Sequence, residues 1–340
     1  MTSEIPRPPR VVLAGSVGSS RRTLQGLLRH RASVVGVLGF SPDRAAGVSG
    51  YARLDDLALG AGLPFKEFQS LNHPEVVACV RAWAPDLLFV VGLSELVRPE
   101  LLAVPRLGCV GFHPTPLPAG RGRAPIAWLT LDAQPGAATF FLMEAGVDSG
   151  PILVQEPFPV TRQDYAADVL ARLEAAIDAA LDRWLPELLA GRWQPTPQDP
   201  ARATYTGRRT PEDGLIDWRR PAEEIYDLVR AASRPHPGAY TYLNDERLVV
   251  WRADLECEQT YRGVIGRIVQ AEPGRGVLVQ TGAGQLWLTE VTLASGGAAP
   301  LRVGQRLGYA PEDEVFLLRR RLVALEARLA RLEAEGGRAP

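Results

Sequence analysis

A histidine and an aspartate each follow an apolar run and could do acid–base chemistry together. His113 ends the run 107–112 and is followed at once by the proline-rich PTPLP, while Asp148 lies in the loop EAGVDSG after a second run, 138–143. Because prolines cannot continue a sheet ladder, the chain must leave the sheet directly after the histidine. Ligands of an open α/β sheet bind at the carboxyl ends of its strands, so we expect the two side chains to meet over a shared cleft.

A carboxylate beside a histidine fixes the tautomer of the ring and stabilises the imidazolium, so the pair can take a proton near neutral pH. That chemistry suits a general base acting on an amine. The spacing alone leaves a second interpretation equally open. In it, His113 is a structural histidine bonded to a loop carbonyl, and Asp148 is a turn or cap residue.

A longer motif surrounds the pair. It consists of His113-Pro114-Thr115-Pro116-Leu117-Pro118, Arg121-Gly122, Pro125 and Gly146-Val147-Asp148-Ser149-Gly150. This order and spacing resemble the folate-dependent formyltransferases, which carry His-Pro-Ser/Thr-x-Leu-Pro-x-x-Arg-Gly-x-x-Pro and, further on, Gly-x-Asp-x-Gly. The resemblance is of the methionyl-tRNA formyltransferase type and closest to the nucleotide-sugar N-formyltransferases. It implies transfer of a formyl group from the cosubstrate 10-formyltetrahydrofolate to an amine, with His113 as the base and Asp148 as its orienting partner.

The same resemblance implies where the ligands bind. The expected folate contacts are Val91, Gly92, Leu93, Pro114, Leu117, Pro118 and Gly146, and the expected acceptor contacts are Gly15, Ser16, Arg121, Gly122 and Arg123. Arginine forks match phosphate oxygens, which makes a nucleotide diphosphate a suitable ligand for the Gly-Arg-Gly-Arg loop, and a solvated basic loop is the alternative. The turn GSVGSS could hold a phosphate at a helix N-terminus, but it lacks the dinucleotide glycine spacing, so a plain strand-to-helix turn is also open.

One position departs from the family pattern. The family's catalytic set is Asn, His and Asp, with the Asn two residues before the His, and this chain has Gly111 there. In the family that Asn is thought to donate a hydrogen bond to the oxyanion, and loss of such a donor typically costs about a hundred- to a thousandfold in rate. Three interpretations are open: a backbone N–H, a water or protonated His113 replaces the amide; the chemistry has drifted; or catalysis is lost.

Composition narrows the class of protein. A chain of 340 residues can form two or three domains. With 38 basic and 39 acidic residues, it lacks the basic excess of a general nucleic-acid binder. Three dispersed cysteines without CxxC spacing indicate a reducing compartment and argue against a structural zinc site. No run approaches a membrane span and the N-terminus has no signal-peptide core, so we expect a soluble cytoplasmic protein that needs no metal.

The order of patterns predicts the domains. Alternating strand and helix patterns through residues 1–190 predict a catalytic α/β domain with a doubly wound, Rossmann-like parallel sheet. The proline-rich stretch that begins at Gly191 reads as the start of a linker and helical connector, 191–238. Five short alternating strands predict a small β-barrel over 239–312.

Residues 313–335 read as an amphipathic heptad helix. Leu318, Leu322, Leu325, Leu329 and Leu332 recur at intervals of 4, 3, 4 and 3 residues. Two interpretations remain open: the helix forms a homo-oligomer, or it packs on its own barrel.

The acceptor is a further open choice. The GSVGSS turn, the arginine loop and a C-terminal domain that is not basic favour a nucleotide-linked amino sugar, with initiator methionyl-tRNA as the second candidate. A tRNA enzyme would need a contiguous basic face. Gly111 also leaves room for a folate- or nucleotide-binding protein without turnover, and water could replace the amine in a hydrolytic variant. His236, which stands between prolines, reads as structural.

Overall fold

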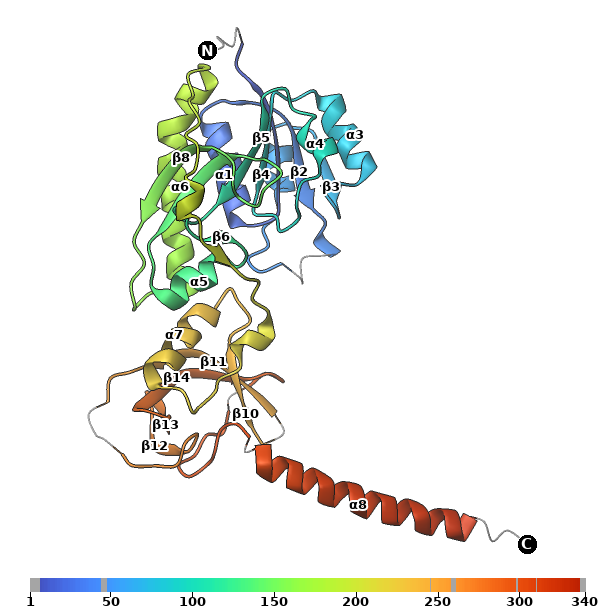
Figure 1. Ribbon diagram of the computed structural model, residues 1–340, viewed down its shortest axis with the longest axis vertical. Helices are drawn as coiled ribbons and strands as arrows, with labels where there is room; N and C mark the ends of the chain where they lie inside the picture. The colour runs from blue at the N-terminus through green and yellow to red at the C-terminus, as the bar shows by residue number, and fades with distance from the viewer. Residues whose placement is uncertain are drawn as a thin grey trace. The chain divides into compact units, whose positions relative to one another are not determined.

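The computed structural model describes residues 7–43, 48–244, 246–257, 261–297, 299–309 and 311–336. Contacts divide the chain into two compact units (Figure 1). Unit 1 comprises Met1–Leu215 and Tyr226–Ala239, and unit 2 comprises Ile216–Ile225 and Tyr240–Pro340.

Unit 1 is built on a seven-stranded sheet. In sheet order its strands are β3 (Phe65–Phe68), β2 (Ser33–Phe40), β1 (Arg10–Gly15), β4 (Leu87–Val91), β5 (Gly108–His113), β7 (Gly136–Leu142) and β8 (Ile152–Phe158). Its helices are α1 (Gly18–Arg29), α2 (Asp55–Gly60), α3 (Pro74–Trp83), α4 (Pro99–Leu102), α5 (Pro125–Asp132) and α6 (Ala166–Leu189). The predicted α/β class with its Rossmann-like core is confirmed.

Both faces of the central strands are apolar, so helices cover both. Because side chains alternate along a strand, Val11 and Leu13 pack in the core with α1 and α6, while Val12 and Ala14 pack in a second core with α3 and α4. Figure 1 shows α3 and α4 beside the strands, away from α1 and α6. The same alternation along β5 places Gly111 and His113 on the face of Cys109, which packs with α3 and α4.

The direction of β7 corrects one step of the sequence argument. Strands β1 to β5 are parallel, as predicted, but β7 pairs antiparallel to β5 and β8 antiparallel to β7. His113 pairs with Thr139, and Leu142 at the end of β7 pairs with Val110. The carboxyl ends of β5 and β7 therefore point in opposite directions, and the loop after β7 must turn back to bring Asp148 to His113.

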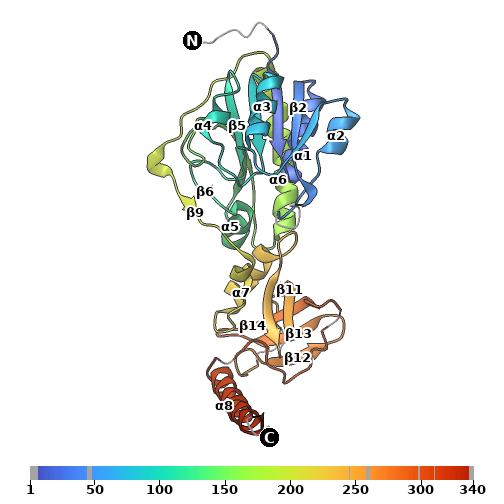
Figure 2. The same cartoon turned by 90° about the vertical axis from the view of Figure 1, so that its right-hand side faces the viewer.

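The stretch that begins at Gly191 does not behave as a linker. Residues 191–215 belong to unit 1. There β9 (Tyr205–Thr206) pairs with β6 (Arg121–Gly122), as the two neighbouring labels in Figure 2 indicate. Two short 3₁₀ helices, Pro200–Arg202 and Pro211–Gly214, complete this segment. The backbone bridge between Thr196 and Ile152 and the side chain of Trp193, which packs against the core, attach this segment to the rest of unit 1.

Unit 2 contains the five strands that the sequence predicted. They are β10 (Ala239–Leu243), β11 (Glu246–Asp254), β12 (Ile268–Glu272), β13 (Gly276–Gln280) and β14 (Gln285–Leu293), in the order β10-β11-β14-β13-β12. The pairs β11–β14, β14–β13 and β13–β12 are antiparallel. The predicted helix α8 (Pro311–Gly336) is present in unit 2. The predicted helix α7 (Ala222–Ala232) begins in unit 2, and its residues from Tyr226 on belong to unit 1. No helix in the described part of the chain has the length and apolarity to cross a membrane.

Candidate functional site

His113 is the last residue of β5 and is held from one side by the loop that follows it. Its ring is nearly buried, and Nε2 lies 2.8 Å from the carbonyl oxygen of Gly120. A carbonyl only accepts hydrogen bonds, so Nε2 carries the proton in this contact. In the neutral ring, Nδ1 is therefore the atom with the free lone pair.

Asp148 faces that free nitrogen. Its Oδ2 lies 3.7 Å from Nδ1 of His113 and accepts a hydrogen bond of 2.9 Å from the backbone N–H of Gly122. Asp148 has a φ of 48°, a left-handed conformation that few residues other than glycine adopt, though Asp does so more readily than most. Such local strain persists only where the surroundings enforce it.

This geometry changes the role expected for the carboxylate. The Gly120 carbonyl, and not Asp148, fixes the ring tautomer. Nδ1 of His113 can take a proton from a reacting group, and the carboxylate of Asp148 then stabilises the imidazolium by charge. The pair is arranged for proton transfer at Nδ1.

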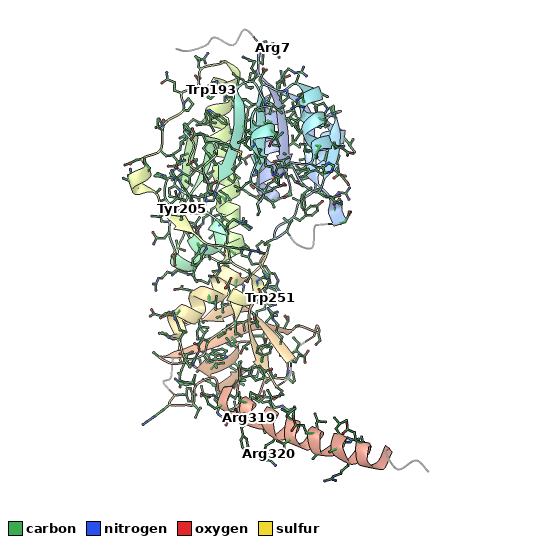
Figure 3. All side chains as sticks on the ribbon, turned by 45° about the vertical axis from the view of Figure 1, so that its right-hand side comes forward. Arg7, Trp193, Tyr205, Trp251, Arg319 and Arg320 are labelled. Atoms are coloured by element: carbon green, nitrogen blue, oxygen red, sulfur yellow. The ribbon has the colours of Figure 1, made fainter. Side chains whose placement is uncertain are left out.

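Gln198 is the residue that holds the Asp148 loop, and sequence reasoning missed it. Its amide donates to the carbonyl oxygens of Asp148 at 2.8 Å and Gly150 at 2.7 Å. Its Oε1 accepts from Nη2 of Arg121 at 2.7 Å, and Nη1 of Arg121 donates to the hydroxyl of Tyr205 at 3.0 Å. Tyr205 is labelled in Figure 3. A lone glutamine in a proline-rich stretch carries no motif that would have revealed this contact.

The glycine of the Arg-Gly pair is required by the neighbouring strand. Gly122 has a φ of 111°, and a Cβ there would lie 2.4 Å from the carbonyl oxygen of Thr206 in β9. A backbone atom cannot give way as a flexible side chain can, so only glycine fits. The close approach of β9 thus places the Gly122 N–H that binds Asp148.

We predict that Gln198→Ala lowers kcat/KM by about tenfold to a hundredfold while the protein stays folded. The reason is that the loop of Asp148 loses its two anchors, at the carbonyls of Asp148 and Gly150, and a misplacement of about 1 Å can be this costly. Steady-state kinetics with a thermal melt beside them would measure both effects. Gln163→Ala in the loop before α6 is a matched control, for which we expect unchanged kinetics; equal losses in the two variants would contradict the anchoring role.

The space beside Gly111 is filled. A Cβ at this position would lie 2.7 Å from Cζ of Phe141 and 2.9 Å from Cγ of Met143. Phe141 is 3% exposed and Met143 packs against the core beneath α3 and α4. Two apolar side chains therefore occupy the position from which the family's Asn side chain would start.

A cavity of about 900 Å³ opens within unit 1. Its walls include Ser16, Val48, Ser49, Gly50, Gly92, Leu93, Glu95, Arg123, Arg208, Arg209 and His236. The carboxylate of Glu95 accepts hydrogen bonds from Ser70, Leu71 and Asn72, which favour its ionised form at the cavity wall. Three arginines, Arg123, Arg208 and Arg209, bring positive charge to the same lining.

The other predicted site residues divide into two groups. Ser16, Gly92, Leu93 and Arg123 line the 900 Å³ cavity, and Gly122 binds Asp148. Gly15, Val91, Pro114, Leu117, Pro118, Arg121 and Gly146 do not line it, and neither do His113 and Asp148. Arg121, expected to meet the acceptor, is 4% exposed and its guanidinium is bound by Gln198 and Tyr205, so it supports the loop from inside.

His236 lies in the cavity wall with an open nitrogen. Ser49 Oγ donates to the Pro235 carbonyl at 3.2 Å and therefore accepts from Nδ1 of His236 at 3.0 Å. Nε2 is buried and has no hydrogen-bond partner among the described residues. Burial, and then the positive charge of Arg209, lower the pKa of His236 below its usual value.

In the part of the chain that the structure describes, no three His, Cys, Asp or Glu side chains lie close enough together to hold a metal ion.

Two sequence models match the chain along most of its length. Residues 12–185 match the formyl transferase model, and residues 208–303 match the model of the formyl transferase C-terminal domain. The chain belongs to the formyl transferase family. Its nature as a formyltransferase, predicted from the resemblance of the motif around His113, is thereby confirmed.

Individual relatives extend the comparison. This formyltransferase is 37% identical over 315 residues to the methionyl-tRNA formyltransferase of Acidithiobacillus ferrooxidans (strain ATCC 53993 / BNL-5-31). The match covers 89% of this chain and 96% of that protein. HypX of Aquifex aeolicus in complex with tetrahydrofolic acid has a TM-score of 0.61 at 18% identity. The match covers 84% of this chain but only 44% of HypX.

A second solved structure matches over nearly its whole length. The N-formyltransferase of Helicobacter canadensis, in complex with folinic acid and dTDP-3-aminofucose, has a TM-score of 0.58 at 15% identity, over 82% of this chain and 98% of that protein. At these identities the two solved structures establish that the formyltransferase shares their fold.

Proposed function

We propose that this formyltransferase transfers the formyl group of 10-formyltetrahydrofolate to the primary amine of a nucleotide-linked amino sugar. The observation that carries this proposal is the cavity of about 900 Å³ that Arg123, Arg208 and Arg209 line. A volume of this size suits a small ligand. Arginine forks bind phosphate oxygens in pairs, so a nucleoside diphosphate matches the charge of the walls.

The chemistry follows from His113 and Asp148. The amine nitrogen attacks the formyl carbon, and its proton passes to Nδ1 of His113, which faces Asp148 at 3.7 Å. The bond between the formyl carbon and the folate nitrogen then breaks. The proton held by His113 goes to the leaving nitrogen, so that tetrahydrofolate and the formamide are the products.

The cavity wall also supports the proposed place of the folate. Gly92 and Leu93 continue from the end of β4, which pairs with β5, and both line the cavity. The backbone of this segment can meet the polar edge of a pterin, as the family resemblance implies. Pro114, Leu117, Pro118 and Gly146 belong to the motif but do not line the cavity, so we propose no folate contact for them.

Initiator methionyl-tRNA is a second candidate acceptor. The observation that favours it is the relationship to the Acidithiobacillus ferrooxidans enzyme, 37% identical over 96% of that protein, which is named for this activity. The net charge of −1 argues the other way, because tRNA binding draws on a basic face.

A folate-release assay separates the candidates. Tetrahydrofolate formation from 10-formyltetrahydrofolate would be measured with a panel of nucleotide amino sugars and with initiator methionyl-tRNA, beside His113→Ala. We expect release that depends on an amino sugar and is lost in the variant. Release only with the tRNA would select the second candidate, and release without any acceptor would indicate hydrolysis.

We predict that nucleoside diphosphates bind more tightly as the pH falls. An anion beside His236 favours the protonated ring and raises the pKa of His236, which is lowered in the free protein. Binding of the anion therefore takes up a proton. The affinity rises as the pH falls from the pKa of His236 in the complex to its pKa in the free protein. Titration calorimetry with uridine and thymidine diphosphates should show roughly tenfold tighter binding at about pH 5.5 than at pH 7.5. His236→Gln should remove this dependence; an unchanged dependence would exclude His236 as its source.

A further inference from the structure

Helix α8 has a continuous apolar seam that no described residue of unit 2 covers. Numbering the helix in heptads places Val315, Leu322 and Leu329 at the a positions and Leu318, Leu325 and Leu332 at the d positions. Each of these side chains is between 51% and 62% exposed. A helix that packed on its own domain would bury one such face, so the seam is built for another surface.

An apolar seam with this spacing is typically covered by a second helix. A 3.5-residue apolar repeat lets two helices supercoil and insert each a and d side chain between four residues of the partner. Leucine at every d position, together with the β-branched Val315 at one of the three a positions, is compatible with two strands. The described seam from Val315 to Leu332 provides about two and a half heptads within a helix of 26 residues.

The charged residues that flank the seam identify the second helix. In a parallel, in-register pair, each g residue meets the e residue five positions later on the other helix. Glu314 then meets Arg319 of the second copy, Arg321 meets Glu326 and Arg328 meets Glu333. Figure 3 marks Arg319 on α8. Every one of these pairs joins opposite charges, and by symmetry each occurs twice.

The antiparallel arrangement lacks this complementarity. With the a and d layers aligned, it sets Arg321 against Arg328 and Glu312 against Glu333, both of like charge. Only the contact between Arg319 and Glu326 remains attractive. Like charges at these flanking positions select against a pairing.

We propose that α8 joins two copies of this chain as a parallel, two-stranded coiled coil. The occupant of the seam is the α8 helix of the second copy, in register. The proposal is independent of the acceptor and of formyl transfer, because it rests on residues of α8 alone.

The test exchanges charges at the flanking positions of the full-length protein. One variant, Arg321→Glu with Arg328→Glu, places like charges opposite each other in a homodimer. A second variant, Glu326→Arg with Glu333→Arg, does the same with the opposite sign. Mixed together, the two variants regain opposite charges at all four altered contacts. Arg320→Glu with Arg331→Glu is the matched control, since it makes the same change in net charge at positions that face solvent in the dimer.

Analytical ultracentrifugation across protein concentration gives the readout. We expect a dimer for the natural sequence and for the control, with a dissociation constant on the order of micromolar for so short a coil. Each charge variant alone should dimerise about a hundredfold more weakly, and the equimolar mixture should regain the dimer. This rescue cannot come from variants that merely fail to fold.

Three results would overturn the proposal. A natural protein that stays monomeric up to about 100 µM has no such interface. A dimer that both charge variants leave intact uses another surface or another pairing of helices. A trimer or larger assembly excludes the two-stranded arrangement.

Discussion

Replacing His113 with alanine is expected to lower kcat/KM for formyl transfer by about a thousandfold. The variant removes Nδ1, the atom placed 3.7 Å from the carboxylate of Asp148 to take the proton of the attacking amine. Asp148→Asn keeps an acceptor for the Gly122 N–H but removes the negative charge, so we expect a loss of about a hundredfold. Because the two residues act as a unit, the double variant should lose little more than His113→Ala alone.

The measurement combines steady-state kinetics, with the acceptor that supports turnover, and a thermal melt for each variant. His73→Ala, at the exposed start of α3, is the matched histidine control and should leave both readouts unchanged. A His113→Ala variant that keeps more than about a tenth of the activity, well above the range for loss of a general base, would show that proton transfer does not pass through this ring.

Introducing the family's asparagine alone is expected to damage the protein. In Gly111→Asn the new Cβ would lie 2.7 Å from Cζ of Phe141 and 2.9 Å from Cγ of Met143. Overpacking of this kind typically costs 1–3 kcal/mol of unfolding free energy, which corresponds to a fall in Tm of roughly 2–10 °C. Phe141→Leu shortens the side chain that fills the space, so it should relieve part of this cost when the two changes are combined.

A double-mutant cycle of Gly111→Asn and Phe141→Leu measures that coupling. We expect the double variant to be more stable than the sum of the single effects by at least about 1 kcal/mol. Gly60→Asn is the control, because a Cβ at Gly60 meets nothing within 4 Å. If the two changes in unfolding free energy were strictly additive, Gly111 and Phe141 would not be coupled. Packing against Phe141 would then not explain why this chain lacks the Asn.

Most of what could be predicted about the site came from the motif around His113. An apolar run that ends in histidine and prolines has few possible positions in an α/β sheet, and the strand β5 ends at that residue. The direction of β7 was not predictable, because the period of two that marks a strand is the same in either direction. The expected contact between His113 and Asp148 is nevertheless present, since the loop after β7 turns back.

Three further features lacked a sequence signal for a physical reason. Arg121 stands between glycines and reads as a solvated side chain, yet its guanidinium is satisfied inside the fold by Gln198 and Tyr205. The tautomer of His113 depends on the Gly120 carbonyl, and any residue could supply a carbonyl in the same place. His236 lies in the cavity wall because Ser49, which is 187 positions away in the sequence, folds against it.

The Gln198 anchor has a consequence for how the chain acquires its activity during synthesis. The formyl transferase match ends at residue 185, and the helix α6 ends at Leu189, so a nascent chain of that length already has every strand of the main sheet. Asp148 still lacks its anchors, because the glutamine and the β9 strand that place it and Gly122 have yet to emerge. A truncated protein that stops there should fold around its sheet and remain inactive, and the catalytic geometry should form only once the chain extends past Thr206.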